Sequence, residues 1–247
     1  MYFQETILPP IVIALTAIVF YVVHKGSSRF LGEKHKYLGE ELIENISLST
    51  ISIVQAICLI FFTILYLLTG YNRIVEILVY ITMTSFASEM FISNTMRKDM
   101  LYHHIVTICL CILVILQIAN DINGDSVNYS LYGSVGLIEV SSVFLHMKYI
   151  LKNFAEAMSD QSDENIMLSP LKTNRDKPIE RLYAAVHILF LITFFLFRVI
   201  FLPLLALFSI GMIFTNFISY ILFLAFVGLN ISWALIMWKK YIIKENK

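Results

Sequence analysis

The chain has 247 residues, of which 58% are hydrophobic and only 15% are charged. Water-soluble domains are usually just under half apolar, so this composition excludes an ordinary soluble globular protein and indicates a membrane protein. The formal net charge of zero argues against a nucleic-acid partner, because binding to phosphates requires a basic surface.

Seven apolar runs, each of roughly 17 to 25 residues, are long enough to cross a hydrocarbon core of about 30 Å as helices. Lipid offers backbone amides no hydrogen-bond partner, and no run alternates like a barrel strand. We therefore predict an all-α membrane protein, a bundle of about seven transmembrane helices. In chain order, the predicted spans are 7–23, 46–69, 74–92, 100–118, 127–151, 182–208 and 212–238.

The first run has no basic residue before it, and Pro9 and Pro10 stand at its entrance. It also lacks a small-x-small cleavage site, so we interpret it as a true span rather than as a cleaved signal peptide. The predicted organisation is a first helix with its cytosolic connection over residues 1–45, a helical domain over 46–242 and a cytosolic tail over 243–247.

Basic residues are distributed unevenly over the connections between the runs. With seven spans the connections alternate sides, and fifteen of the eighteen Lys and Arg residues then fall on one side. That side comprises residues 24–45, 93–99 and 152–181 and the tail after Trp238. Positive connections face the cytosol, so we expect a lumenal or outside amino terminus and a cytosolic carboxyl terminus.

The connection 153–180 is polar, acidic at first and basic later, and it contains Pro170 and Pro178. This composition is typical of a flexible cytosolic loop, with a regulatory or docking segment for protein partners as the alternative. A cargo receptor that uses this loop is a further interpretation of the chain. The oligomeric state, including a homodimer, stays open.

The three cysteines, Cys58, Cys109 and Cys111, all lie inside predicted spans, so we expect no disulfide framework. At a spacing of two residues, Cys109 and Cys111 point to different sides of a helix, and the paired repeat of a structural zinc site is absent. The histidines and acids also lack a repeated ligand spacing. We therefore predict no metal site.

Several polar and ionisable side chains lie at membrane depth, where a charge costs several kcal/mol unless it is partnered or hydrated. Most of them fall in one layer near the predicted cytosolic ends of their helices. Glu139, Ser142 and His146 also share a helix face, because they recur at intervals of three and four. We expect this layer to form a lipid-binding cavity that faces the cytosol. Its expected lining residues are Gln55, Glu89, Ser142, His146, His187 and Asn230.

An adjacent pair, His103 and His104, lies on the order of 5 Å inside the fourth span. Histidine takes up and returns protons near neutral pH, and Asp99, one turn before His103, is aligned to orient its imidazole. The candidate catalytic residues are therefore His103 and His104, with Asp99, Glu89 or Glu139 as the orienting acid, for acyl transfer or hydrolysis. The alternative is that the pair only forms hydrogen bonds between helices. The two rings point about 100° apart and cannot share one role.

Arg198 lies well inside the sixth run, in the stretch FFLFRVIFLP. We expect it to pair with a buried acid or carbonyl, or to reach the outer interface, rather than to bind a ligand. Pro203 follows about one turn later and predicts a kink in the helix.

Four stretches of the chain together resemble the TLC-domain family, the membrane superfamily that includes the ceramide synthases. They read SLSTISIVQAIC, RKDMLYHHIVTICL, LYGSVGLIEVSSVFLHMKYILKNF, and FFLFRVIFLPLL with LNISWALIMWKKYI, and they cover most of the chain from Ser47 to Ile242. The resemblance implies a seven-helix bundle in the endoplasmic reticulum or a related membrane. It also implies a lipid substrate or ligand.

In ceramide synthases the paired histidines belong to the site of acyl-CoA-dependent N-acylation, which maps onto His103 and His104. Those enzymes carry a His-Asp-x-x-Asp motif in the next helix, where this chain has residues 138–142 with Glu139 as the one acid. Gln55 stands where a histidine is often found. The chain therefore resembles more closely the non-synthase members, which are implicated in lipid homeostasis or trafficking.

The leading prediction is a protein that holds a lipid or acyl chain in a cytosol-facing cavity and affects membrane lipid homeostasis or transport. The alternative is an acyltransferase of ceramide-synthase type that acts on a sphingoid base or related lipid. Acyl-CoA is then the co-substrate, and we expect no other cofactor.

Overall fold

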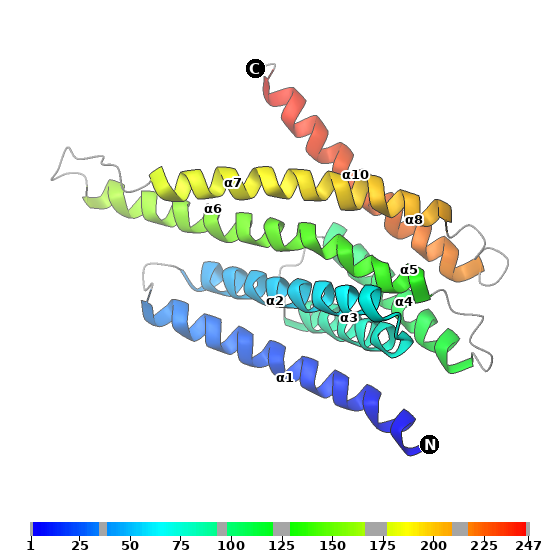
Figure 1. The fold of residues 1–247 in the computed structure, drawn as a ribbon. Coiled ribbons are helices and arrows are strands. Elements are labelled where there is room, and N and C mark those ends of the chain that lie inside the picture. Colours follow the sequence, from blue (N-terminus) through cyan, green and yellow to red (C-terminus); the bar gives the residue numbers. More distant parts are fainter. Residues whose placement is uncertain are drawn as a thin grey trace.

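The computed structural model describes residues 2–34, 39–92, 98–120, 129–165, 177–208 and 217–245, and nearly all of them are helical (Figure 1). The helices are α1 (Tyr2–Lys34), α2 (Glu40–Thr69), α3 (Asn72–Ile92), α4 (Lys98–Asn120), α5 (Tyr129–Val135), the short 3₁₀ helix η1 (Gly136–Ile138), α6 (Glu139–Asn165), α7 (Lys177–Phe194), the π-helical segment η3 (Phe195–Phe201), α8 (Leu202–Phe208) and α10 (Phe217–Glu245).

Among the described residues, seven segments are long and apolar enough to cross a membrane, which confirms the predicted fold class. The fifth span joins α5, η1 and α6, and the sixth joins α7, η3 and α8. Large apolar side chains are exposed along the outside of the bundle, as expected of surfaces that contact lipid.

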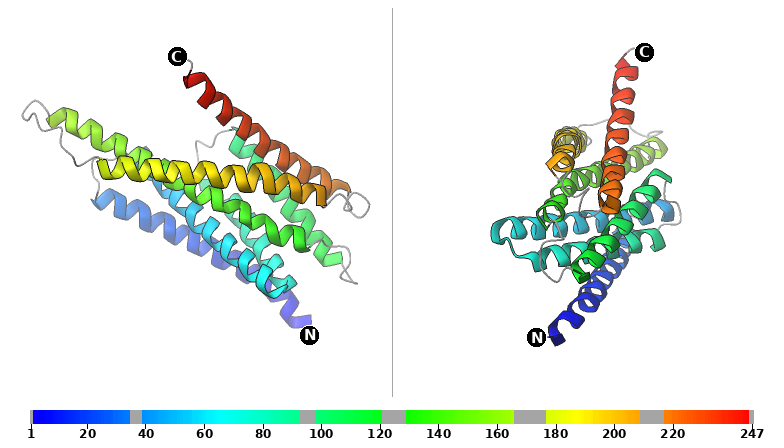
Figure 2. Two further views of the ribbon diagram at one scale, coloured as in Figure 1. Left: turned by 45° about the horizontal axis from the view of Figure 1, so that its top comes forward. Right: turned by 90° about the vertical axis from the view of Figure 1, so that its right-hand side faces the viewer.

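Spans two to seven form a closed ring. Helix α2 packs on α3, α3 on α4, α4 on α10, α10 on η3, α7 on α6, and α6 returns to α2. Helix α1 lies outside this ring against α2 and α3, on the face opposite α7 and α10 (Figure 2). We call the end of the ring at which α2, α4 and α7 begin the basic end, and the opposite end the far end.

Two glycines allow η1 and α5 to approach α2 closely. A Cβ atom on Gly136 would overlap Thr63 Oγ1, and one on Gly133 would overlap the ring of Tyr66. Only hydrogen atoms fit in these gaps, so any larger residue has to push the helices apart. This approach fixes Glu139, the next residue after η1, beside the centre of the ring.

Two predicted boundaries are wrong. Helix α1 extends to Lys34, whereas the predicted first span ends at residue 23. The predicted flexible loop 153–180 is helical over 153–165, where α6 continues, and over 177–180, where α7 begins. The reason is that residues 153–165 contain Ala, Glu and Met and neither Gly nor Pro, so the helix continues beyond the span. Residues 166–176 lie outside the described residues.

The sixth span departs from α-helical geometry just before Pro203. Residues 195–201 form the π-helical segment, and the Leu202 N–H donates to the carbonyl of Phe197. Proline has no N–H and crowds the preceding turn, so a wider turn here accommodates it. The predicted disturbance at Pro203 therefore takes the form of a π-segment, and Arg198 lies at its centre.

Candidate functional site

A polar cavity of about 50 Å³ lies inside the ring, between α2, α3, α4, α6, η3 and α10. We call it the polar chamber. Its lining residues are Ser52, Gln55, Phe86, Glu89, Met100, His103, His104, Glu139, Ser142, Leu145, His146, Arg198 and Trp233. Five different spans thus contribute polar side chains to one space.

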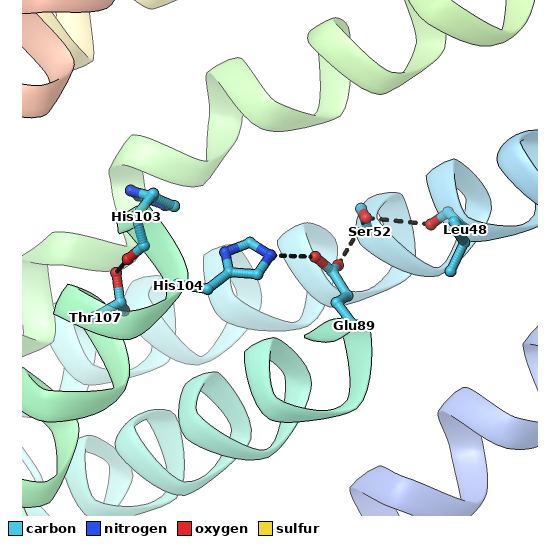
Figure 3. Close-up of polar contacts among 6 residues, drawn as sticks. All are labelled: Leu48, Ser52, Glu89, His103, His104 and Thr107. Carbon is cyan, nitrogen blue, oxygen red and sulfur yellow. Dashed lines mark hydrogen bonds and ion pairs between the residues drawn. The ribbon is translucent and has the colours of Figure 1, made fainter. Parts of the chain in front are cut away.

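A carboxylate and an imidazole form the central contact of the chamber. His104 Nε2 lies 2.9 Å from Glu89 Oε2, and Ser52 Oγ donates to Glu89 Oε1 at 2.7 Å (Figure 3). Glu89 is near the end of α3 and His104 near the start of α4, and the packing of α3 on α4 brings them together. An imidazole that donates from Nε2 keeps Nδ1 as its acceptor, and Nδ1 of His104 is buried without a protein partner.

His103 has a different environment from its neighbour. Its ring stacks on Phe226 with centroids 5.2 Å apart, and it lies against Trp233 at the same distance and edge-on to Phe86 at 5.6 Å. Only 4% of His103 is exposed, and no acid pairs with it among the described residues. The two histidines thus have different surroundings, and a difference in their roles stays a prediction.

A second cavity of about 70 Å³ lies further from the basic end and is mostly apolar. We call it the apolar cavity. Its lining residues are Leu59, Leu78, Val79, Thr82, Phe86, Thr107, Leu110, Cys111, Val114, Tyr132, Val135, Gly136, Glu139 and Phe226.

Phe86 and Glu139 line both cavities, so the polar chamber and the apolar cavity meet at these two side chains. The Phe86 ring stacks on His104 with centroids 4.5 Å apart. Glu139 begins α6 and makes no hydrogen bond or ion pair within the described part of the chain. A carboxylate therefore marks the boundary between a polar and an apolar compartment.

Arg198 closes the chamber on the side of η3. Its Nε donates to Ser141 Oγ, its Nη1 to Asn230 Oδ1 and its Nη2 to Ser142 Oγ, each at 2.7 Å. Asn230 Nδ2 in turn donates to the carbonyl of Phe226 at 2.8 Å. These bonds join α6, η3 and α10 across the interior of the ring.

A comparison with protein families gives a match to the TLC domain over residues 45–239. The chain belongs to the TLC-domain family. Neither the comparison with curated proteins nor that with solved structures gave a match. The family and the seven apolar segments make this an integral membrane protein with a lipid-related role.

The structure brings together most of the predicted site residues in the TLC domain. Seven of them line the polar chamber: Gln55, Glu89, His103, His104, Glu139, Ser142 and His146. Glu139, Ser142 and His146, which were predicted to share one face of α6, all line the polar chamber. Whether any of them acts in catalysis stays a prediction.

Two predicted site residues of the TLC domain are placed elsewhere, and a third has a side chain that the structure does not describe. His187 does not line the chamber, because it is three turns nearer the basic end than Arg198. It stacks on Tyr183 near the middle of α7, with centroids 6.0 Å apart. Asn230 is fully buried but contacts Arg198 rather than the chamber. The side chain of Asp99 lies outside the described residues, and among those described the acid paired with His104 is Glu89.

Sequence reasoning assigned Arg198 a structural role and did not include Ser52, Phe86 or Trp233 among the candidate site residues. An arginine inside an apolar run is itself a signal of function. This signal was not used in the sequence analysis, because Arg198 was expected to pair with a buried acid. The aromatic residues carry no such signal, because most aromatic residues in this chain pack in the bundle or face lipid. In the described part of the TLC domain, no group of three or more His, Cys, Asp or Glu side chains could hold a metal ion.

Proposed function

We propose that this TLC-domain protein binds an amphiphilic lipid, with the polar head in the polar chamber and the acyl chain in the apolar cavity. Through this binding it affects the composition or transport of membrane lipids. The observation that carries the proposal is the shared wall of the two cavities at Phe86 and Glu139. A ligand that crosses this wall meets ionisable groups at one end and apolar side chains at the other.

Lipids match this arrangement better than fully polar metabolites do. Each buried methylene of a chain contributes about 0.8 kcal/mol, and a polar molecule would gain nothing from the apolar cavity. Conversely, an apolar molecule in the chamber would leave Nδ1 of His103 and Nδ1 of His104 without polar partners, which is costly at low dielectric. Only a ligand with both characters satisfies both spaces.

The proposal places the basic end in the cytosol and the protein in the endoplasmic reticulum or a related membrane. Support comes from the fifteen basic residues that alternating connections place at this end. Labelling of engineered single cysteines at positions 35 and 71 with a bilayer-impermeant maleimide tests it. We expect labelling of position 35 from the cytosolic side and of position 71 only from the lumen, and the reverse pattern would contradict the orientation.

Two cysteines on α4 provide a matched test of lipid binding. Cys111 lines the apolar cavity and is 7% exposed, whereas Cys109 is exposed on the outside of the bundle. Cys111→Phe fills the apolar cavity, and Cys109→Phe adds the same side chain where it contacts lipid. Mass spectrometry of lipid retained through purification in mild detergent measures the effect.

We expect wild type and Cys109→Phe to retain the same lipid, and Cys111→Phe to retain about tenfold less, because the larger ring occupies the space of the acyl chain and overpacking costs about 1 to 3 kcal/mol. Equal retention by both variants would contradict binding in the apolar cavity. A folded wild-type protein that retains no lipid above the detergent background would contradict the proposed function itself.

An acyltransferase is the second candidate function, and the Glu89–His104 contact favours it. In this scheme the amine of a sphingoid base or related lipid attacks the thioester carbonyl of acyl-CoA. The C–N bond forms, the C–S bond breaks, and CoA leaves as the thiol. His104 Nδ1 accepts the proton of the amine and returns it to the leaving sulfur, while Glu89 holds the Nε2 proton.

Turnover of palmitoyl-CoA with sphinganine by the purified protein tests this second function. We expect His104→Gln and Glu89→Gln to lower kcat at least about a hundredfold, a typical contribution of general acid–base catalysis. His187→Gln, a histidine outside the chamber, is the matched control. No turnover by wild type under conditions where it binds lipid would leave the binding function and exclude this acyl transfer.

A further inference from the structure

Arg198 places a positive charge inside the bundle without a carboxylate partner. The side chain is 5% exposed and lies at the centre of the π-helical segment η3. Among the ion pairs of the described residues, none includes Arg198. Its remaining contact is with the Phe194 ring, whose centroid is 5.9 Å from Cζ.

The three groups that hold the guanidinium are all neutral. Ser141, Ser142 and Asn230 accept one hydrogen bond each, and together they use three of the five N–H groups of the arginine. Asn230 is itself fixed by its bond to the Phe226 carbonyl, so Oδ1 is oriented toward Arg198. The arginine is therefore held in place by neutral groups, and the Glu139 carboxylate acts on its charge across the chamber without a direct contact.

A role in packing alone does not explain this choice of residue. A buried cation without a directly bonded counter-ion is costly, and a neutral glutamine could also donate hydrogen bonds to these acceptors. Each terminal nitrogen of Arg198 keeps one N–H that no group of the described residues accepts, and the side chain lines the polar chamber. Two such N–H groups on one planar fork match two oxygens of a carboxylate or phosphate.

The other charges of the chamber limit where an anion can bind. Glu89 already accepts hydrogen bonds from Ser52 and His104, so its charge is partly compensated. Glu139 has no such partner and faces the same space as Arg198 without lying within 4 Å of it. His146 completes the set of ionisable groups on this side of the chamber. Glu139 therefore opposes an anion at Arg198, and its removal has the opposite effect to removal of the arginine.

We propose that Arg198 binds the anionic head, a carboxylate or a phosphate, of a single-chain lipid whose chain passes Phe86 into the apolar cavity. This inference rests on the proposed lipid binding and names the charge of the ligand. Ser141, Ser142 and Asn230 act as positioning residues that hold the guanidinium toward the chamber. Phe86 and Glu139 lie where the head of the lipid continues into its chain.

Four probes with the same sixteen-carbon chain test the proposal on the purified full-length protein in detergent. They are palmitate, hexadecyl phosphate, hexadecanol and hexadecylamine, so that only the head differs. We expect palmitate or hexadecyl phosphate to bind wild type at least about tenfold more tightly than hexadecanol, the effect of one charge-assisted hydrogen bond of 1.4 kcal/mol or more. The comparison of the two anions distinguishes a carboxylate from a phosphate site.

Three variants then assign the preference to Arg198. Arg198→Gln should bring the ratio of anion affinity to hexadecanol affinity close to one, and Arg198→Lys should restore part of it. Glu139→Gln should raise the affinity for the anion a few-fold. Arg29→Gln, which removes an exposed arginine outside both cavities, is the control and should leave all four affinities unchanged.

The wild-type comparison alone can overturn the inference, even if Arg198→Gln does not fold. Equal binding of palmitate, hexadecyl phosphate and hexadecanol would show lipid binding without recognition of an anion. Preference for hexadecylamine, lost in Glu139→Gln, would show that the chamber binds a cation instead. Absence of binding by all four probes would contradict the proposed function as well as this inference.

Discussion

The polar chamber and the apolar cavity are built from the same helices and differ in the side chains that those helices present. Helix α2 presents Ser52 to the chamber and Leu59, two turns further along, to the cavity. Helix α4 presents His104 to the chamber and Cys111, again two turns further, to the cavity. The polarity thus changes within about 10 Å along both helices. This change of lining within one interior is what selects an amphiphile over a polar or an apolar ligand.

The largest expected effect on stability comes from a substitution in the wall of the apolar cavity. Gly136→Val places a branched side chain against Thr63 and the Leu59 carbonyl, where even a Cβ atom does not fit. We expect a loss of about 3 kcal/mol in the free energy of unfolding, measured by denaturant titration in detergent micelles. Gly228→Ala in α10 is the matched control, because a Cβ there meets no atom within 4 Å. A loss in Gly136→Val no larger than in this control would contradict the close approach of η1 to α2.

The next largest effect on stability comes from removal of an acid in the polar chamber. Glu89→Ala leaves His104 Nε2 and the Ser52 hydroxyl without their shared acceptor in a buried space. We expect a loss of about 2 kcal/mol, the cost of unsatisfied buried polar groups. Glu33→Ala is the control, because it breaks an ion pair with Arg29 at the surface. The Arg29 side chain is 83% exposed and the Glu33 side chain 63% exposed, so the loss should be at most about 0.5 kcal/mol. Equal effects of the two variants would mean that water reaches Glu89 as freely as it reaches the surface.

A smaller effect separates the members of the hydrogen-bonded set. Ser52→Ala removes one of the two bonds to Glu89 and leaves the bond from His104, so we expect a loss of about 1 kcal/mol in the same titration. Ser232→Ala, which removes an exposed hydroxyl bonded to the Leu229 carbonyl, should change stability far less. If Ser52→Ala cost as much as Glu89→Ala, the serine and not the histidine would be the main partner of the acid.

The smallest expected effect marks the edge of the chamber. His187→Gln changes a histidine that stacks on Tyr183 outside both cavities, and we expect lipid retention to stay within about twofold of wild type. Quantification of retained lipid by mass spectrometry checks this. A loss comparable to that of Cys111→Phe would place His187 in the binding site, as the sequence predicted.

The sequence predicts the fold well because a chain that crosses lipid can adopt few kinds of secondary structure. Each apolar run has to be a helix long enough to cross the membrane, and seven such runs are found. Helix ends are less well predicted, since a helix such as α6 can continue into water wherever the chain lacks Gly and Pro.

Most residues of the candidate site could be predicted from the sequence, but the contacts between them could not. Polar residues in apolar runs are conspicuous, so Glu89, His104 and Glu139 could be identified from the sequence. That Glu89 contacts His104 depends on how α3 and α4 are oriented toward each other. The neutral hydrogen-bond partners of Arg198 lie on helices that are distant in sequence, so no local sequence pattern predicts these contacts.

A photoreactive palmitate with a diazirine near the middle of its chain tests the central claim most directly. After irradiation of the purified protein, mass spectrometry of peptides locates the adducts along α4. The account predicts adducts on residues that line the apolar cavity, such as Leu110, Cys111 and Val114. Adducts confined to the exposed residues Cys109, Ile112 and Leu116 would contradict it, because the chain would then contact only the outside of the bundle.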